Sequence, residues 1–197
     1  MATKIRNIIV LGSGTAGWLT VLFVKKLFPH FNIKIIGNKK IGIIGVGEAT
    51  TPPFVDFLRE IDIDPLTLIN ETGGSIKQGI SFENWNGDGK KYFHGFYEKF
   101  LSNTSIPPLF SHDCGDYYYK HLINKKLDFN EYSYAAKISY KNKTDLSDIA
   151  YAIHFDTNRL SNYLGQIAKE RNIEYIEGDF KKMKLKYDFI FDCSGLS

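Results

Sequence analysis

The sequence predicts an α/β fold in which a parallel sheet is built from the two ends of the chain. Short apolar runs at residues 8–11 and 189–191, and a largely apolar run at 33–36, are typical of strands buried on both faces. A run with helical spacing over 16–28 lies between the first two strands, so the three segments predict a βαβ unit. We therefore expect a Rossmann-like core with a mixed α+β segment inserted into it.

Composition and charge narrow the class of protein. The chain has 197 residues, 43% of them hydrophobic and 24% charged, which suits a single globular domain. A net charge of +3 without a long basic run does not indicate nucleic-acid binding. The two cysteines, Cys114 and Cys193, form no disulfide framework, so a reducing cytoplasm is expected. The uncharged run over 8–24 is interrupted by glycines and is shorter than the roughly 20 residues of a membrane span, so no membrane association is expected.

The elements after the first βαβ unit follow in order. The stretch 41–51 is rich in glycine and too flexible for a regular element. Proline in the first turn predicts a helix over 53–61, and a second short helix begins at 64–65. Alternating residues over 75–85 predict one strand, and the Asn-Gly-Asp-Gly turn over 86–89 returns it as a hairpin.

The last third of the chain returns to a regular α/β pattern. A helix is predicted over 113–127, whereas 128–152 fit no single element. An amphipathic helix follows Asp156 and ends near Asn172. A strand over 173–176 comes next, and the final strand leads into an Asp-Cys-Ser-Gly segment.

A glycine-rich turn at 12–17 joins the first predicted strand to the first predicted helix, which is the context that dinucleotide binding requires. Gly12 permits the tight turn, Gly14 lets the backbone approach a pyrophosphate, and Gly17 lets the helix pack close to the sheet. The phosphates would rest on backbone N–H groups at the start of the helix. A glycine-rich turn that binds nothing is the alternative. The candidate phosphate-binding residues are Gly12, Gly14, Thr15, Ala16 and Gly17.

The end of the second strand departs from the usual dinucleotide-binding pattern. An acidic residue normally follows this strand and binds the adenosine ribose, but Gly37 and Asn38 stand here. Asn38 can hydrogen-bond a hydroxyl, yet it offers no bidentate carboxylate contact. We therefore expect a lower affinity for an ADP-ribose group.

Five segments together resemble the flavin-dependent tryptophan halogenase family, in the family's order and at compatible spacings. They are the turn 12–18, the loop Gly45-Val-Gly-Glu-Ala-Thr50, Lys77 with the phrase 79–85, His154-Phe-Asp156, and Asp192-Cys-Ser-Gly195. The resemblance implies an FAD-binding fold of the flavin monooxygenase type. It implies a dinucleotide-binding core from 1–52 and 150–197, and an inserted substrate-side segment over 53–149.

The resemblance also implies how FAD is held. The glycine turn binds the pyrophosphate, and the mobile loop over 45–50 lies along the flavin. The backbone of Phe180 matches a position that touches the adenine, and the final segment turns near the cofactor. A solvated loop carboxylate is the alternative for Glu48. The further cofactor-binding candidates are Gly47, Glu48, Ala49, Thr50, Phe180 and Gly195.

In the family, reduced FAD and oxygen convert halide to hypohalous acid, and a lysine delivers the halogen to an aromatic substrate. Lys77 matches that lysine and is the candidate catalytic residue. Apolar neighbours on a strand would destabilise its ammonium form and favour the reactive amine. A solvent-facing strand lysine is the alternative. The resemblance further implies a separate flavin reductase as partner.

Other features suggest an incomplete halogenase. The family's Trp-x-Trp-x-Ile-Pro signature is absent, the family's members are more than twice this length, and 178–188 leave little room for a β-meander. We expect an N-terminal part that is inactive alone. It could be a truncated gene product, one half of a split enzyme with a complementing C-terminal half, or a partial sequence of a longer chain. The alternatives are a non-catalytic flavin- or nucleotide-binding remnant and a small NAD(P)-dependent reductase. The loop over 45–50 and the lack of a Tyr-x-x-x-Lys pattern argue against the reductase.

Overall fold

The computed structural model describes residues 5–38, 41–42, 45, 47–96, 130, 133–146 and 150–195. The chain divides into two compact units. The first is formed by Met1–Glu48, Phe57–Gly74 and Phe155–Ser197, and the second by Ala49–Asp56 and Ser75–His154. The assignment of these parts to cofactor and substrate stays a prediction.

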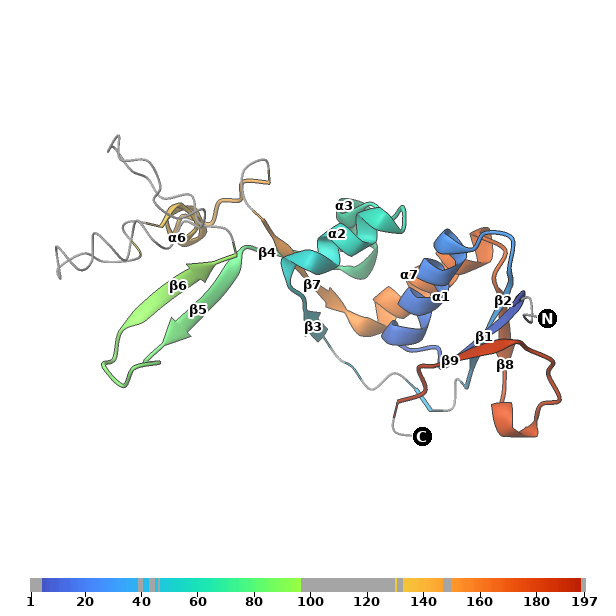
Figure 1. The fold of residues 1–197 in the computed structure, drawn as a ribbon. Helices are drawn as coiled ribbons and strands as arrows, with labels where there is room; N and C mark the ends of the chain where they lie inside the picture. The colour runs from blue at the N-terminus through green and yellow to red at the C-terminus, as the bar shows by residue number, and fades with distance from the viewer. Residues whose placement is uncertain are drawn as a thin grey trace. The chain divides into compact units, whose positions relative to one another are not determined.

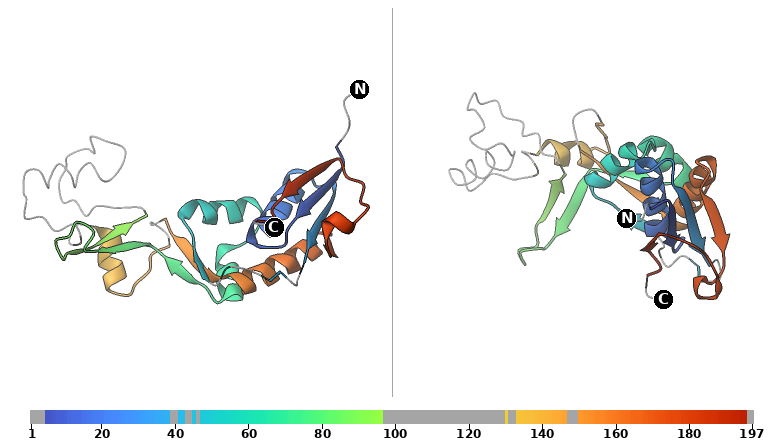
Figure 2. Two further views of the ribbon diagram at one scale, coloured as in Figure 1. Left: turned by 90° about the horizontal axis from the view of Figure 1, so that it is seen from below. Right: turned by 45° about the vertical axis from the view of Figure 1, so that its right-hand side comes forward.

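A four-stranded parallel sheet forms the centre of the first unit (Figures 1 and 2). Its strands, in spatial order, are β8 (Glu174–Glu177), β2 (Asn32–Gly37), β1 (Asn7–Leu11) and β9 (Phe189–Asp192). Strands β1, β2 and β9 were predicted from apolar runs, and β8 was predicted over 173–176. The parallel α/β core predicted from the sequence is therefore confirmed.

Three helices complete the first unit. Helix α1 (Thr15–Leu27) packs on β1 and β2 and contacts α7 (Thr157–Glu170), which also contacts α3 (Pro65–Thr72). The Asp156 side chain accepts a hydrogen bond from the backbone of Arg159 (2.8 Å) and so fixes the start of α7. None of the helices in the described ranges is long and apolar enough to span a membrane. Fully buried side chains of the core include Val10, Val21, Leu22, Ile35, Leu160 and Leu164.

Strand β9 presents aromatic side chains at the edge of this sheet. Within the described residues its hydrogen-bonded neighbour is β1. Phe189 and Phe191 lie on one face of the strand, with their ring centroids 5.0 Å apart. Because Phe189 is 45% exposed, this pair forms an apolar surface, which we call the β9 aromatic pair.

A three-stranded sheet has the order β3 (Gly47–Ala49), β7 (Ala152–Asp156) and β4 (Ser75–Lys77). Strand β3 corrects the expectation that 41–51 hold no regular element. The backbone N–H of Thr50 donates to the carbonyl of Ile153 (3.0 Å), and the Thr50 hydroxyl accepts from the Ile153 N–H (3.0 Å). Pairing with β7 therefore orders the end of the glycine-rich loop. Helix α2 (Pro52–Glu60) begins directly after it, as predicted.

A β-hairpin is formed by β5 (Gly79–Glu83) and β6 (Lys91–Gly95) in the second unit. The turn between them was predicted, but the single strand over 75–85 was not correct. The strand divides at Gln78, because β4 pairs with β7 whereas β5 pairs with β6. Gly79 lies so close to β6 that a Cβ there would be 2.7 Å from the Phe93 ring.

Two short helical segments were not predicted. Helix α6 (Tyr134–Tyr140) begins at Ser133, whose hydroxyl accepts from the backbone of Ala136 (2.9 Å). A single 3₁₀ turn, η1 (Phe180–Lys182), follows β8. The helix predicted over 113–127 lies outside the described residues.

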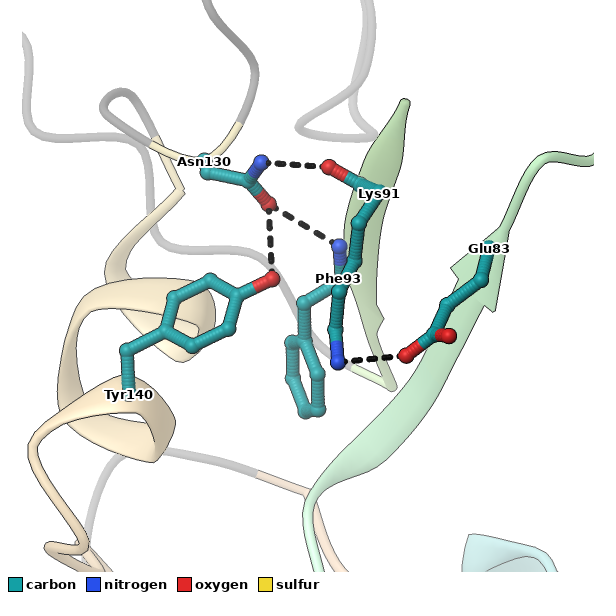
Figure 3. A network of polar contacts seen from close by, with 5 residues as sticks. All are labelled: Glu83, Lys91, Phe93, Asn130 and Tyr140. Atoms are coloured by element: carbon teal, nitrogen blue, oxygen red, sulfur yellow. Dashed lines mark hydrogen bonds and ion pairs between the residues drawn. The ribbon is translucent and has the colours of Figure 1, made fainter. Parts of the chain in front are cut away.

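The side chain of Asn130 bonds to β6 in the manner of a neighbouring strand (Figure 3). Its amide nitrogen donates to the carbonyl of Lys91 (3.0 Å), and its oxygen accepts from the backbone N–H of Phe93 (2.9 Å). The Tyr140 hydroxyl reaches the same oxygen at 3.5 Å, and an ion pair joins Lys91 to Glu83 on β5 (2.6 Å). One side chain thus satisfies backbone groups that an edge strand leaves open.

Candidate functional site

A pocket of about 560 Å³ lies at the carboxyl ends of the parallel strands in the first unit. This is the edge at which open α/β sheets bind their ligands, because the loops after the strands diverge there. The lining comes from the segments that directly follow the four strands of the sheet. Residues further along the chain between β2 and the end of the loop at 45–50 complete it. The lining residues are 11–16, 36–38, 178–181 and 193–195, together with Ile41, Gly42, Gly45 and Glu48.

Two glycines of the turn at 12–17 permit close packing of backbone on backbone. Gly12 has φ +102°, and a Cβ there would lie 2.6 Å from the carbonyl carbon of Cys193. A Cβ on Gly17 would collide with the carbonyl of Gly12. The Gly12 N–H donates to the carbonyl of Ile36 (2.7 Å), which ties the turn to the end of β2. These glycines therefore hold the turn against β2 and β9.

Gly14 has a different environment. No heavy atom lies within 4 Å of the position its Cβ would take, and it caps α1 without a side-chain hydrogen bond. Thr15 and Ala16, in the first turn of α1, line the pocket, and that turn carries no acidic residue. Backbone N–H groups at a helix start lack intrahelical partners and favour an anion. The turn therefore fits a pyrophosphate.

The structure brings most of the predicted cofactor-binding residues to this one pocket. Gly17 packs behind the turn, and Gly47 is not among the lining residues of the pocket. Ala49, Thr50 and Lys77 belong to the second unit. The predicted residues that line the pocket are Gly12, Gly14, Thr15, Ala16, Glu48, Phe180 and Gly195.

The loop before β3 is anchored on the start of α7. Gly45 lies close to Thr157, since a Cβ there would be 2.8 Å from the Thr157 methyl group. The same Cβ would be 3.0 Å from a carboxylate oxygen of Glu48, so the Glu48 side chain folds back over its own loop. Glu48 is exposed and lines the pocket, so its carboxylate is available to a ligand there.

The segment after β9 is shaped by Asp192. Its carboxylate accepts hydrogen bonds from the Ser194 hydroxyl (2.6 Å) and backbone N–H (3.0 Å). These bonds hold the pKa of Asp192 below its ordinary value. The Cys193 N–H donates to the carbonyl of Leu11 (2.7 Å), which continues the pairing of β9 with β1. The segment 193–195 is thereby directed into the pocket lining.

A buried network ties the glycine turn to α7 and β8. The indole N–H of Trp18 donates to the Ser161 hydroxyl (2.9 Å). That hydroxyl in turn donates to the carbonyl of Ser13 (3.3 Å). Trp18 also stacks on Tyr175, with ring centroids 5.9 Å apart. Burial is the main cause that raises the pKa of Tyr175 to about 12, and the hydrogen bond to Glu177 is the second. The hydroxyl therefore stays protonated at neutral pH.

Three of the lining residues after β8 were not predicted from the sequence. They are Gly178, Asp179 and Lys181, and Gly178 (φ +147°) at the end of the strand was the available signal. Ser13, Gly45 and Ser194 also line the pocket and lie in segments that were predicted to approach the cofactor.

Lys77 is half-buried at the end of β4 in the second unit. Its ammonium donates to the carbonyl of Thr50 (3.2 Å) and lies 5.1 Å from the ring centroid of Phe96. Both are contacts that a cation favours. Lys77 is therefore held beside the last residue of the loop at 45–50, and its catalytic role stays a prediction.

The parallel sheet, the glycine turn and the pocket at the strand ends define an α/β protein with the architecture of dinucleotide-binding proteins. Comparison with known proteins narrows this class. Residues 7–196 match the family model for tryptophan halogenase, and the chain belongs to this family of flavin-dependent enzymes.

The similar proteins include characterised halogenases. Tryptophan 7-halogenase RebH of Lentzea aerocolonigenes is 26% identical over 99% of this chain and 43% of its own length. The 7-chloro-L-tryptophan 6-halogenase KtzR of a Kutzneria strain is 24% identical over 90% of this chain and 39% of its own length. The solved structure of Xcc4156, a flavin-dependent halogenase from Xanthomonas campestris, has a TM-score of 0.81 and 25% identity, covering 97% of this chain and 42% of that one. The chain thus spans about two fifths of the length of its relatives.

Proposed function

We propose that this chain carries the FAD-binding site and the halogen-delivering lysine of a flavin-dependent halogenase. The observation that carries the proposal is the pocket at the strand ends, where Gly14, Glu48 and Phe180 meet. Family membership supports it independently. The open space at Gly14 and the uncapped start of α1 are the features that a pyrophosphate needs.

In this proposal the backbone holds most of the cofactor. The N–H groups of Thr15 and Ala16 bind the pyrophosphate, the backbone at Phe180 contacts the adenine, and the loop ending at Thr50 lies along the flavin. When bound, reduced FAD supplies the electrons with which oxygen and halide form hypohalous acid. The electrons come to FAD from a separate flavin reductase.

Lys77 receives the halogen in the second unit. Hypohalous acid either accepts a hydrogen bond from Nζ or halogenates the amine with release of water. The halogen then passes to an electron-rich aromatic compound such as an indole, pyrrole or phenol. The contacts of Nζ with Thr50 and Phe96 would set its position.

We also propose that halogenation requires polypeptide equivalent to the rest of the relatives' length. The chain spans about two fifths of that length, and an oxidant such as hypohalous acid must be kept from escaping into water before it reaches the substrate. A C-terminal segment equivalent to that part of the relatives would supply it, either within the same polypeptide or as a separate chain.

An equilibrium titration of the 197-residue chain with FAD, followed by flavin fluorescence, tests the binding site. We expect saturable binding that excess NADH does not displace. Displacement by NADH would favour the alternative of a small NAD(P)-dependent reductase. A folded chain that binds neither FAD nor NADH would contradict the proposed function.

A further inference from the structure

In this protein, neighbouring side chains occupy the space that a ribose-binding carboxylate would normally take. Dinucleotide-binding sheets normally carry an acidic residue at the end of the second strand. Here β2 ends at Gly37, where a Cβ would collide with the Ser13 side chain and lie 2.9 Å from the Tyr175 ring. A carboxylate therefore has no room at this position, and the next residue, Asn38, carries no charge.

The neighbouring strand places a carboxylate at the same edge of the sheet. Strand β8 runs parallel to β2 with Glu177 beside Gly37, and the Gly178 N–H donates to the carbonyl of Gly37 (2.8 Å). Gly178 has φ +147°, a conformation that favours glycine, and the chain turns there. Asp179 follows and lines the pocket together with Gly37, Asn38 and the glycine turn.

Two acidic residues stand at this end of β8, and the geometry favours one of them. Glu177 accepts a hydrogen bond from the Tyr175 hydroxyl (2.5 Å) and is not among the residues that line the pocket. Asp179 lines it, with one carboxylate oxygen accepting from the Lys181 N–H (3.0 Å) and the other 3.5 Å from the Lys182 ammonium. A carboxylate has about four acceptor positions, so Asp179 retains capacity for two hydroxyls.

We propose that Asp179 binds the ribose hydroxyls of the adenosine half of FAD, in place of the acidic residue that β2 lacks. The inference rests on the proposed function, since it requires FAD in the pocket at the strand ends. It makes Asp179 a determinant of specificity for FAD over FMN, which has the same flavin and ribityl phosphate but no adenosine.

The test compares dissociation constants for FAD and FMN in the wild-type chain and three variants. Asp179→Asn keeps an oxygen for the Lys181 N–H and so preserves η1. Asp179→Ala removes both this acceptor and the carboxylate proposed to bind the ribose. Glu177→Gln is the matched control at the same strand end. We expect Asp179→Ala to raise the dissociation constant for FAD about tenfold or more. Asp179→Asn should raise this constant as well, and Glu177→Gln should leave it unchanged. FMN binding should be unchanged throughout.

A second readout separates contact with the ribose from an effect on the loop. ADP should displace FAD from the wild-type chain better than 2′,3′-dideoxy-ADP does, and Asp179→Asn should abolish that difference. Equal weakening of FAD and FMN, or a difference between the two nucleotides that persists in the variant, would overturn the role of Asp179 while leaving FAD binding intact. A wild-type chain that binds FAD no more tightly than FMN would overturn it as well. Failure of both flavins to bind would instead contradict the proposed function itself.

Discussion

Gly14 differs from the other glycines of the turn because a side chain there meets open space. Its backbone (φ −79°, ψ −175°) is extended, a conformation that valine adopts readily. We predict that Gly14→Val keeps the fold and weakens FAD binding at least tenfold, because the side chain occupies the approach of the pyrophosphate. Flavin fluorescence and thermal unfolding measure the two effects separately.

Gly12→Ala provides the contrast. Its φ of +102° and its contact with the Cys193 carbonyl make any side chain there costly to the fold, so this variant should unfold at a lower temperature. If Gly14→Val bound FAD as tightly as the wild-type chain, the glycine turn would not be part of the cofactor site.

Lys77 gives the corresponding prediction for chemistry. In an enzyme complemented with the C-terminal part of a relative, Lys77→Ala should reduce halogenated product to background and leave the FAD dissociation constant unchanged. Product is measured by mass spectrometry. Phe96→Leu is the matched control, since it removes a contact of the ammonium but keeps the amine. Undiminished product from Lys77→Ala would exclude Lys77 from the mechanism.

Residue patterns alone predicted the part of the site that a local turn defines, whereas Glu48, Phe180 and Gly195 were predicted from the family resemblance. Gly12 and Gly14 lie in a strand–turn–helix segment, so their positions follow from a few neighbouring residues. Asp179 and Ser194 line the same pocket because β8 and β9 pair with β2 and β1, more than a hundred residues away in the chain. Such pairing has no local signal in the sequence.

At the scale of elements, Asp188 joins the start of β9 to the start of β1. Its carboxylate accepts from the backbone N–H groups of Arg6 (2.9 Å) and Asn7 (2.8 Å), and these bonds lower the pKa of Asp188. A lowered pKa in the folded state means that the carboxylate stabilises the fold above its unfolded pKa of about 3.9. This contribution is lost as the pH falls through the folded pKa.

We therefore predict that Asp188→Asn lowers the unfolding temperature at pH 5 to 7, and that the difference from wild type shrinks below about pH 4. Thermal unfolding at a series of pH values measures this. A difference that is constant from pH 7 to pH 3 would show that the effect of Asp188 does not depend on its charge.

Asn130 gives a prediction for the hairpin. Asn130→Ala should accelerate amide hydrogen exchange at Phe93, because the N–H loses its acceptor, and should destabilise the hairpin by about 1 kcal/mol. Asn130→Asp keeps an acceptor for that N–H but loses the donor to the Lys91 carbonyl, so it should protect Phe93 better than alanine does. Equal exchange at Phe93 in wild type and both variants would contradict the role of Asn130.

The elements differ in how well the sequence predicts them. Strand β1 was predicted from a continuous apolar run, and β2 from an apolar run that only Lys34 interrupts. The division of 75–85 at Gln78 was missed because alternation continues through it, and the change of partner from β7 to β6 depends on distant residues. The bond of Asn130 to β6 is likewise a tertiary contact, 37 residues away from Phe93 in the chain.

At the scale of the whole molecule, we expect the β9 aromatic pair to promote association between copies of the chain. Exposed apolar side chains on an edge strand promote contact between copies. We predict that Phe189→Lys shifts concentration-dependent self-association to about tenfold higher concentration, as measured by light scattering. Trp85→Lys is the matched control, because Trp85 is an aromatic residue of the second unit that is 71% exposed. An equal effect of both substitutions would show that general surface hydrophobicity, and not β9, drives the association.

The same aromatic pair has a consequence for the life of the protein in a cell. Chaperones and proteases act on the unfolded fraction of a protein, and a change of about 1–2 kcal/mol in stability alters abundance several-fold. A polypeptide segment that covered the 45% exposed Phe189 would stabilise the folded chain, and we expect it to lengthen the lifetime of the chain in a cell. The half-life of the chain would then report whether that face is covered.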